Sequence, residues 1–384
     1  MQYENTRLAD YTEEEEGAGS VDLPFLMLTL LLLTIGVIMV LSASFASAYY
    51  DMGNETGGRA TYYFIRQLIF AVGGTGIMLL CSRFPMSFYR SISGIVLLVA
   101  IGCLLAVLVI GTKVNGARRW INLGFTTFQP SEIAKIAVIL FFASLICKNG
   151  SRMRTFRHGI LPFAVVLGII VGLLVFEPHL SASVIILGVG AVMLFLGGVR
   201  LYWFVGGGIL LSLAAFILIR FFPYASSRIT TWQDPFSDMQ GAGWQIVQSL
   251  YAIGSGGLLG LGLGQSRQKY LYLPEEHNDF IFSVVCEELG FIGAMLILAL
   301  FALLIIRGYW LAMHSRDRYS FLVGCGITTL LAIQVILNVA VCTNFIPATG
   351  ISLPLFSYGG TALLIQMAEM GIVLSLSREI PTRK

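Results

Sequence analysis

Ten apolar runs, each close to the length of a membrane-spanning helix, occupy most of this chain. They lie at residues 23–44, 67–82, 92–111, 132–147, 160–176, 181–198, 202–219, 280–306, 321–342 and 360–376. A helix needs about 20 predominantly apolar residues to cross the hydrocarbon core of a bilayer. The sequence therefore predicts an all-α polytopic membrane protein with ten transmembrane helices, and it excludes a soluble globular enzyme and a disordered chain.

The few charged residues predict the orientation of the chain. They make up 12% of the 384 positions, and the net charge of +3 excludes a nucleic-acid partner, which needs a large basic excess. Short cytoplasmic loops carry an excess of Lys and Arg. Most of the 24 Lys and Arg fall on the cytoplasmic side if both termini are placed there. We therefore expect a multi-pass protein of the cell membrane with both termini cytoplasmic.

The predicted spans divide the chain into a membrane domain and two tails. Residues 1–20 form a disordered cytoplasmic tail, residues 21–376 the ten-helix membrane domain, and residues 377–384 a second cytoplasmic tail. The candidate site is formed by three outer segments, at residues 112–131, 220–279 and 343–361. The second of these is the largest and lies between spans seven and eight. Loops of this length are usually functional or disordered, and its many aromatic residues favour a folded segment.

Basic residues cluster in and just after the first outer segment. Lys and Arg are normally enriched in cytoplasmic loops, so the topology does not explain them. Arg118 and Arg119 lie in the first outer segment, and Lys135 follows one turn into the fourth span. Glu132 and Lys135 are three residues apart and share one helix face. These residues predict either an anion site around a phosphate, or a snorkelling lysine with an internal Glu132–Lys135 ion pair.

Acidic residues mark the start of the eighth span. Asp279 lies where the long outer segment meets this span, so its carboxylate could serve as a base near neutral pH or simply cap the helix. Glu288 lies about two turns deeper, where a carboxylate needs a partner, and a structural ion pair is favoured. His277 is most simply an interface residue, because no second His or Cys is near enough to form a metal site.

Glycine and proline mark three irregular segments. Residues 254–264 are Gly-rich but match no phosphate-binding loop, which favours a close-packed or hinged re-entrant turn. Residues 347–361 predict non-helical backbone at the outer edge, tolerated where it lines a cavity. Glu177, Pro178 and His179 form a tight outer turn in which His179 is expected to be exposed.

Together these features predict an outward cavity with cationic residues, a candidate base and apolar walls. Such a cavity suits an amphiphile with an anionic head and a lipid tail. The sequence carries no ATP motif, zinc motif or nucleophile elbow. Two classes of protein remain from the residues alone: an enzyme acting on a lipid-linked anion, and a transporter that moves one.

Four motifs resemble the SEDS family (shape, elongation, division and sporulation), whose members include FtsW and RodA. They are GARRWINLG at 116–124, QPSEIAK at 129–135, LPEEHNDF at 273–280 and PATGISLPLFSYGG at 347–360. The resemblance covers about residues 25–376, and the segments QSLYAIGSGG and GLGQSRQK resemble the division and sporulation branches more than the elongation branch. One departure is His179, where the family commonly has Asp.

The resemblance implies a peptidoglycan glycosyltransferase with ten spans. Such enzymes polymerise lipid II on the outer face of the membrane, for septal wall synthesis in cell division, and release undecaprenyl diphosphate. Their implied partners are a class B penicillin-binding protein, other divisome proteins and the membrane lipids. No cofactor is firmly implied, although a divalent cation, Mg or Mn, is compatible with the reaction. The alternatives within this family are a lipid II flippase and a non-catalytic scaffold for the transpeptidase.

The resemblance also assigns roles to individual residues. Asp279 occupies the place of the family's essential acidic residue and would take the proton from the acceptor's sugar hydroxyl, which attacks the donor's anomeric carbon with inversion. The departing diphosphate would be stabilised by the basic residues Arg119, Lys135 and Arg118. Supporting positions are Glu288, Glu132, His277 and Ser357, the last in the SYGG motif.

Overall fold

The computed structural model describes residues 20–51, 56–114, 117–124, 126–221 and 223–380. Residues 1–19 of the predicted N-terminal tail and residues 381–384 of the C-terminal one lie outside this description. The ten apolar runs coincide with ten helices: α2 (Leu23–Tyr50), α3 (Tyr62–Cys81), α4 (Met86–Ile110), α5 (Pro130–Asn149), α6 (Leu161–Phe176), α7 (Leu180–Leu196), α8 (Leu201–Phe221), α11 (Ile281–Met313), α12 (Arg318–Cys342) and α13 (Gly360–Glu379).

Eight helices within the described chain are long and apolar enough to cross a membrane. Helix α7 and the Leu201–Leu213 part of α8 are two further, shorter apolar stretches. The predicted helical membrane fold is confirmed, and ten remains the predicted number of spans.

The outer segments contain the shorter elements. They are the strands β1 (Thr112–Val114), β2 (Ala117–Asn122) and β3 (Thr127–Phe128), the helices α9 (Pro223–Gln233) and α10 (Trp244–Gly256), and the 3₁₀ turn Pro235–Asp238. A 3₁₀ segment, Gly150–Arg154, and a π-helical segment, Phe156–Ile160, join α5 to α6. The strands form a small antiparallel sheet in the order β1-β2-β3, which an all-α prediction does not include.

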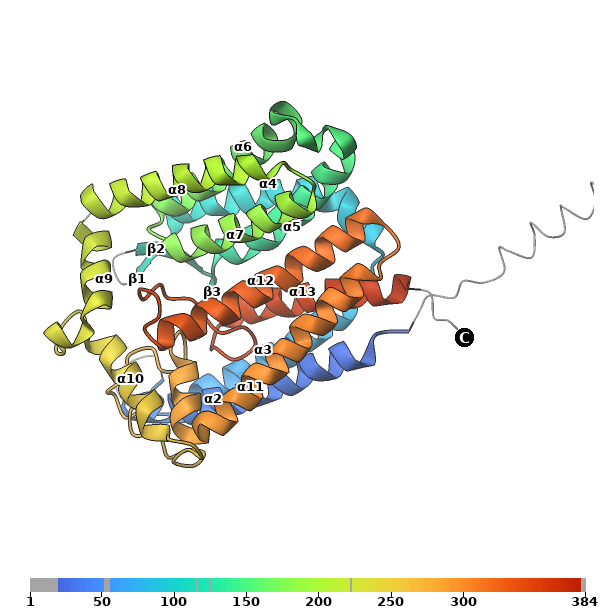
Figure 1. The fold of residues 1–384 in the computed structure, drawn as a ribbon. Helices are drawn as coiled ribbons and strands as arrows, with labels where there is room; N and C mark the ends of the chain where they lie inside the picture. Colours follow the sequence, from blue (N-terminus) through green and yellow to red (C-terminus); the bar gives the residue numbers. More distant parts are fainter. Residues whose placement is uncertain (1–19, 52–55, 115–116, 125, 222, 381–384) are drawn as a thin grey trace, which may run out of the picture.

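The helices pack side by side as a bundle whose two ends differ (Figure 1). The small sheet, α9 and α10 lie at one end of the bundle, and the start of α2 and the end of α13 lie at the opposite end. The three predicted outer segments therefore share one end of the molecule. This arrangement leaves the two described termini together on the other side.

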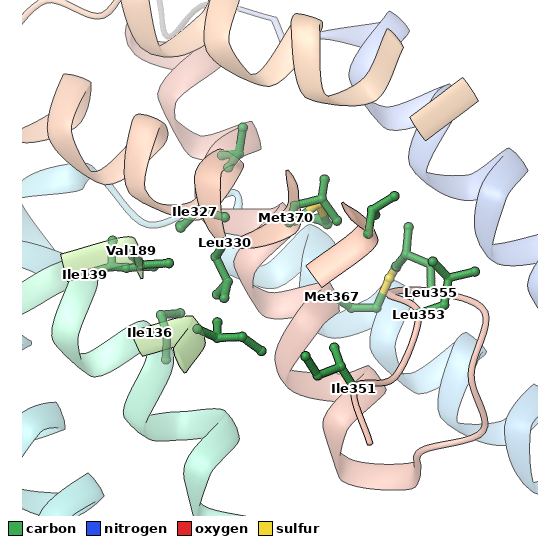
Figure 2. Close-up of a cluster of buried hydrophobic side chains, with 14 of the residues drawn as sticks. Ile136, Ile139, Val189, Ile327, Leu330, Ile351, Leu353, Leu355, Met367 and Met370 are labelled. Atoms are coloured by element: carbon green, nitrogen blue, oxygen red, sulfur yellow. The ribbon is translucent and has the colours of Figure 1, made fainter. Parts of the chain in front are cut away.

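The core joins the central helices to an irregular loop (Figure 2). Buried side chains from α5, α7, α12 and α13 form a cluster that also contains side chains of the loop at residues 343–359, the core loop. The labelled residues are Ile136, Ile139, Val189, Ile327, Leu330, Ile351, Leu353, Leu355, Met367 and Met370. Because the loop contributes apolar side chains to the core, burial of those side chains fixes its path across the outer end of the bundle.

Helix α11 is interrupted near its start by the Gly-rich segment. Gly290 has φ of 69° and ψ of −173°, which breaks the helical hydrogen bonding. The exposed backbone groups pair with the loop instead: Phe291 N–H donates to the Gly257 carbonyl over 2.9 Å, and Leu261 N–H donates to the Glu287 carbonyl over 3.0 Å. The loop thus satisfies backbone groups that cannot remain unpaired within a bundle.

Only glycine fits where these two backbones meet. A Cβ atom built on Gly260 would lie 2.2 Å from the Glu288 carbonyl oxygen, and one on Gly290 would lie 2.2 Å from the Gly260 nitrogen. Both glycines also have positive φ. The prediction of a close-packed turn at residues 254–264 is therefore confirmed.

Candidate active site

Asp279 lies two residues before α11, at the outer end of the bundle. Its backbone carbonyl accepts a hydrogen bond of 2.8 Å from the Asn338 side chain, which also donates to the Ile351 carbonyl over 2.7 Å. The N-cap of α11 is Phe280, and no side chain caps that helix. The alternative that Asp279 caps the helix is therefore wrong, and its partly buried carboxylate is available for chemistry.

The surroundings of the Asp279 carboxylate shift its proton affinity. Burial, with a smaller contribution from the Glu275 carboxylate, raises the pKa of Asp279 to about 6, against the lowering effect of Arg119, His277 and Arg228. Gly350 approaches closely, since a Cβ atom built on it would lie 3.2 Å from the carboxylate Oδ2. A carboxylate with this pKa can accept a proton near neutral pH.

His277 and Ser357 hold the segment that carries Asp279. The Ser357 hydroxyl donates to the Asn278 carbonyl and accepts from the Leu353 N–H, each over 2.7 Å. The His277 carbonyl accepts from Tyr358 N–H over 2.9 Å, and its ring lies 4.4 Å from that of Tyr63. These contacts connect the Asp279 segment to the core loop and to α3.

Arg119 and Arg118 occupy successive positions of β2, whose side chains point to opposite faces. Arg119 donates to the Glu177 carbonyl over 3.4 Å and to the Pro178 carbonyl, and its charge acts on Asp279. Arg118 is exposed and donates to the Leu108 carbonyl at the end of α4 over 3.2 Å. The structure thus brings Arg119, and not Arg118, toward Asp279.

Lys135 lies in a buried charge cluster on α5. Its Nζ atom is 2.7 Å from Glu132 Oε2, so the predicted pair on one helix face is confirmed. Glu369 of α13 is also buried and interacts electrostatically with both residues. This third member is absent from the sequence analysis, although a carboxylate within a predicted span is itself a signal.

In the turn at Glu177, Pro178 and His179, the side chains of Glu177 and His179 are buried and only Pro178 is exposed, which makes the prediction of an exposed His179 wrong. Glu177 is 1% exposed and His179 6% exposed. The turn is covered by the first turn of α5 and by the core loop, because Gln129 contacts the His179 ring at 3.4 Å and Ser181 donates to the Thr349 carbonyl.

Burial shifts the pKa values of both side chains in this turn. It raises the pKa of Glu177 to about 8, partly offset by Arg119. It lowers the pKa of His179 to about 3, and the charges of Arg119 and Lys135 act in the same direction. At neutral pH both side chains are therefore predominantly uncharged.

Glu288 forms the structural ion pair that its depth predicted. Its Oε1 atom lies 3.0 Å from Lys269 Nζ, and both side chains are buried. The carboxylate also accepts from the Ser42 hydroxyl over 2.7 Å. Lys269, which the sequence analysis did not single out, anchors the end of the Gly-rich segment.

Over the described ranges, no group of three or more His, Cys, Asp and Glu side chains is arranged to hold a metal ion. A contribution from a divalent cation, Mg or Mn, stays a prediction.

The fold and the charged outer end define a polytopic membrane protein with a partly buried carboxylate whose pKa is raised and on which cationic groups act. Comparison with known proteins identifies the family. The family of cell cycle proteins represented by FtsW, RodA and SpoVE matches residues 23–381, and the chain belongs to it. The resemblance stated from the four motifs is confirmed.

Similar proteins match along nearly the whole chain. Stage V sporulation protein E of Bacillus subtilis is 41% identical, over 94% of this chain and 97% of that protein. A probable peptidoglycan glycosyltransferase FtsW of Coxiella burnetii is 40% identical, over 94% of this chain and 97% of that protein.

Two solved structures have the same fold. A chain from a study of how a peptidoglycan synthase complex coordinates polymerization and crosslinking is 27% identical, with a TM-score of 0.77 over 95% of this chain and 99% of that one. Rod shape determining protein RodA of Thermus thermophilus is 26% identical, with a TM-score of 0.69 over 94% of this chain and 98% of that one.

Proposed function

We propose that this chain is a peptidoglycan glycosyltransferase that polymerises lipid II into glycan strands for septal wall synthesis. The observation that carries this proposal is the partly buried Asp279 carboxylate at the outer end of the bundle, whose pKa is raised to about 6 and on which the charge of Arg119 acts. The names of the FtsW relatives support the reaction class. The membrane-spanning helices suit a substrate with a long lipid tail.

In the proposed reaction, Asp279 acts as the general base. Its carboxylate takes the proton from the 4-hydroxyl of the acceptor sugar, and that oxygen forms a bond to the anomeric carbon of the donor. The bond from this carbon to the diphosphate breaks as the new bond forms, so the configuration inverts. Undecaprenyl diphosphate leaves with the bonding electron pair. A base of this pKa is well matched to a proton transfer at neutral pH.

Arg119 and Lys135 are proposed to stabilise the diphosphate as its charge develops. Arg119 already donates to two backbone carbonyls, which orient its guanidinium toward the turn after α6. Lys135 is held by Glu132 inside the bundle, so this pair must open or tilt to reach a phosphate. Arg118 faces outward and is proposed to meet the anionic substrate before it reaches the site.

The proposed enzyme is a multi-pass protein of the cell membrane. Both termini are cytoplasmic in this account, and Asp279 faces the opposite side of the membrane. A class B penicillin-binding protein, other divisome proteins and the membrane lipids are its proposed partners. The similarity to a chain studied within a peptidoglycan synthase complex supports the transpeptidase partner in particular.

The test is polymerisation of lipid II by the purified protein, with and without the cognate class B penicillin-binding protein. We expect glycan polymer on a gel, and we expect Arg119→Ala to reduce the rate by about 100-fold, the effect of losing one strong charge-stabilising group. An unchanged rate in Arg119→Ala would rule it out as the diphosphate clamp. If the folded wild type yields no polymer even with its partner, the protein is a lipid II flippase or a scaffold.

A further inference from the structure

Four polar side chains at the outer end of the bundle carry buried atoms that lack a hydrogen bond. Within the described part of the chain, no partner exists for Ser131 Oγ, both oxygens of Glu177, His179 Nδ1 and Thr349 Oγ1. Native proteins leave few such atoms unpaired, because a buried polar atom without a partner loses its hydrogen bonds to water and gains none in return. Several orphaned atoms in one region therefore indicate a place that a ligand or ordered water completes.

Two contacts link the segments that carry these four residues. Gln129, which precedes Ser131 by two positions at the start of α5, lies 3.4 Å from the His179 ring. Ser181, two positions after His179, donates to the backbone carbonyl of Thr349. The orphaned atoms thus belong to the turn after α6 and to the two segments that cover it.

This cluster adjoins the proposed reaction centre on two sides. Arg119 donates to the carbonyls of Glu177 and Pro178 while its charge acts on Asp279. On the other side, Gly350 follows Thr349 directly, and its backbone lies against the Asp279 carboxylate, as the 3.2 Å approach of a built Cβ atom shows. A group bound by the cluster would therefore sit next to the hydroxyl that Asp279 deprotonates.

The cluster offers uncharged hydrogen-bonding groups. The pKa of Glu177 is raised to about 8 and that of His179 is lowered to about 3. At pH 7 the cluster therefore contains a protonated carboxyl and a neutral imidazole. Together with two hydroxyls, they can both donate and accept. The nearby cations Arg119 and Lys135 already provide for an anion, so the cluster suits an uncharged part of the same substrate.

We propose that Glu177, His179, Ser131 and Thr349 form a subsite that binds the acetamido group of an N-acetylated amino sugar. The acetamido carbonyl accepts from the Glu177 carboxyl or a hydroxyl, and its N–H donates to the His179 imidazole. This inference rests on the proposed function, because it assigns one group of the proposed glycan substrate to its place beside Asp279.

The test compares lipid II with a lipid II analogue in which the N-acetylglucosamine carries a free amine. Binding of each is measured by native mass spectrometry in the Asp279→Asn background, where no turnover interferes. We expect this protein to prefer the acetylated substrate about tenfold or more, the equivalent of at least one net hydrogen bond. When Glu177→Leu or His179→Leu is added, this preference should disappear, so that the protein binds the two lipids with about equal affinity.

The ratio of two affinities within one variant does not depend on how much of the protein is folded, so a partly unfolded variant remains informative. Glu177→Gln, which keeps a donor and an acceptor, should retain most of the preference. Ser183→Ala serves as the matched control, because this hydroxyl on α7 already donates to the His179 carbonyl over 3.3 Å. It should leave the preference unchanged.

Two results would overturn the subsite: equal affinity for both lipids in the Asp279→Asn protein, or a preference that persists in both leucine variants. Persistence would assign the orphaned atoms to bound water. Failure of the proposed function is read separately, from the absence of polymer in the wild-type assay, so the two outcomes can be told apart.

Discussion

At the scale of single residues, the reactivity of Asp279 depends on a balance between burial and charge. Burial and Glu275 favour the protonated carboxyl, whereas Arg119, His277 and Arg228 favour the carboxylate. The result is a pKa of about 6, so the group is mostly ionised at neutral pH and still basic enough to take a proton.

This balance predicts the pH dependence of the reaction. A general base must be deprotonated to act, so the rate at saturating lipid II should rise with pH to a plateau, with its midpoint at about 6. Glu275→Gln removes the like charge that raises this pKa, and it should move the midpoint to lower pH. Initial rates of polymerisation between pH 5 and pH 8 measure both. A flat profile over this range would contradict the assignment of Asp279 as the base.

Gly350 provides a second test at this scale. Its φ is +65°, and a Cβ atom there would lie 3.2 Å from Asp279 Oδ2. Gly350→Ala should therefore displace the carboxylate and lower the polymerisation rate by about tenfold, with a strain of about 1–2 kcal/mol. Gly124→Ala is the matched control, since Gly124 has φ of +88° but nothing within 4 Å of a built Cβ. Equal losses of rate in both variants would indicate backbone strain alone.

The sequence predicted residue chemistry where it depends on local spacing. The Glu132–Lys135 pair follows from helical periodicity, and the partner for Glu288 follows from the cost of a lone carboxylate inside a bundle. Tertiary contacts decided the rest. His179 is buried because the core loop covers its turn, and Asp279 is not a cap because α11 begins one residue later than a cap would require.

At the scale of elements, the broken start of α11 is the feature that positions the site. The Gly-rich loop fills the break, and two carboxylates of α11 hold that loop in place. Glu288 pairs with Lys269, and Glu287 accepts from the Ser266 hydroxyl over 2.5 Å and from Arg267 N–H over 2.9 Å. The segment leading to Asp279 is therefore anchored at both of its ends.

The Lys269–Glu288 pair predicts a specific pattern of stability. Lys269→Met leaves a buried carboxylate without its cation and should cost about 3–5 kcal/mol, whereas the double variant with Glu288→Leu should recover most of that loss. Unfolding temperature in detergent measures both. Arg267→Met, an exposed side chain of the same segment, is the control and should change little. A double variant less stable than Lys269→Met would contradict a pair held mainly by charge.

Elements were predictable to different degrees. The apolar runs gave every long helix, because burial in lipid imposes one strong pattern. The small sheet was not predicted, because strands as short as Thr127–Phe128 carry no alternating pattern to detect. The break at Gly290 lies within a predicted span, where a single glycine does not by itself indicate an interruption of the helix.

At the scale of the whole molecule, the small sheet, α9 and α10 lie at the opposite end of the bundle from the start of α2 and the end of α13 (Figure 1). The even number of predicted spans placed both termini on one side, whereas the cytoplasmic assignment of that side, from the distribution of Lys and Arg, stays a prediction. The sequence could not predict how the three outer segments meet, since that depends on the path of the core loop between α12 and α13. Family resemblance supplied the role of Asp279, and the structure supplied its surroundings.

The orientation in the membrane can be measured with reporter fusions. A fluorescent protein fused after residue 384 should fluoresce, because it folds in the cytoplasm, and alkaline phosphatase at the same point should be inactive. Alkaline phosphatase inserted after residue 238, in the outer segment, should be active. The reverse pattern would place Asp279 on the cytoplasmic side and exclude polymerisation at the outer face.

The central claim is that Asp279 is the base of a lipid II polymerase, and one measurement tests it most directly. Purified wild-type, Asp279→Asn and Asp234→Asn proteins are incubated with lipid II and the cognate transpeptidase, and polymer is resolved on a gel while circular dichroism confirms the fold. Asp234 is an exposed carboxylate of the same outer segment. We predict polymer from the wild type and Asp234→Asn and none from Asp279→Asn. Polymer from folded Asp279→Asn at the wild-type rate would contradict the account.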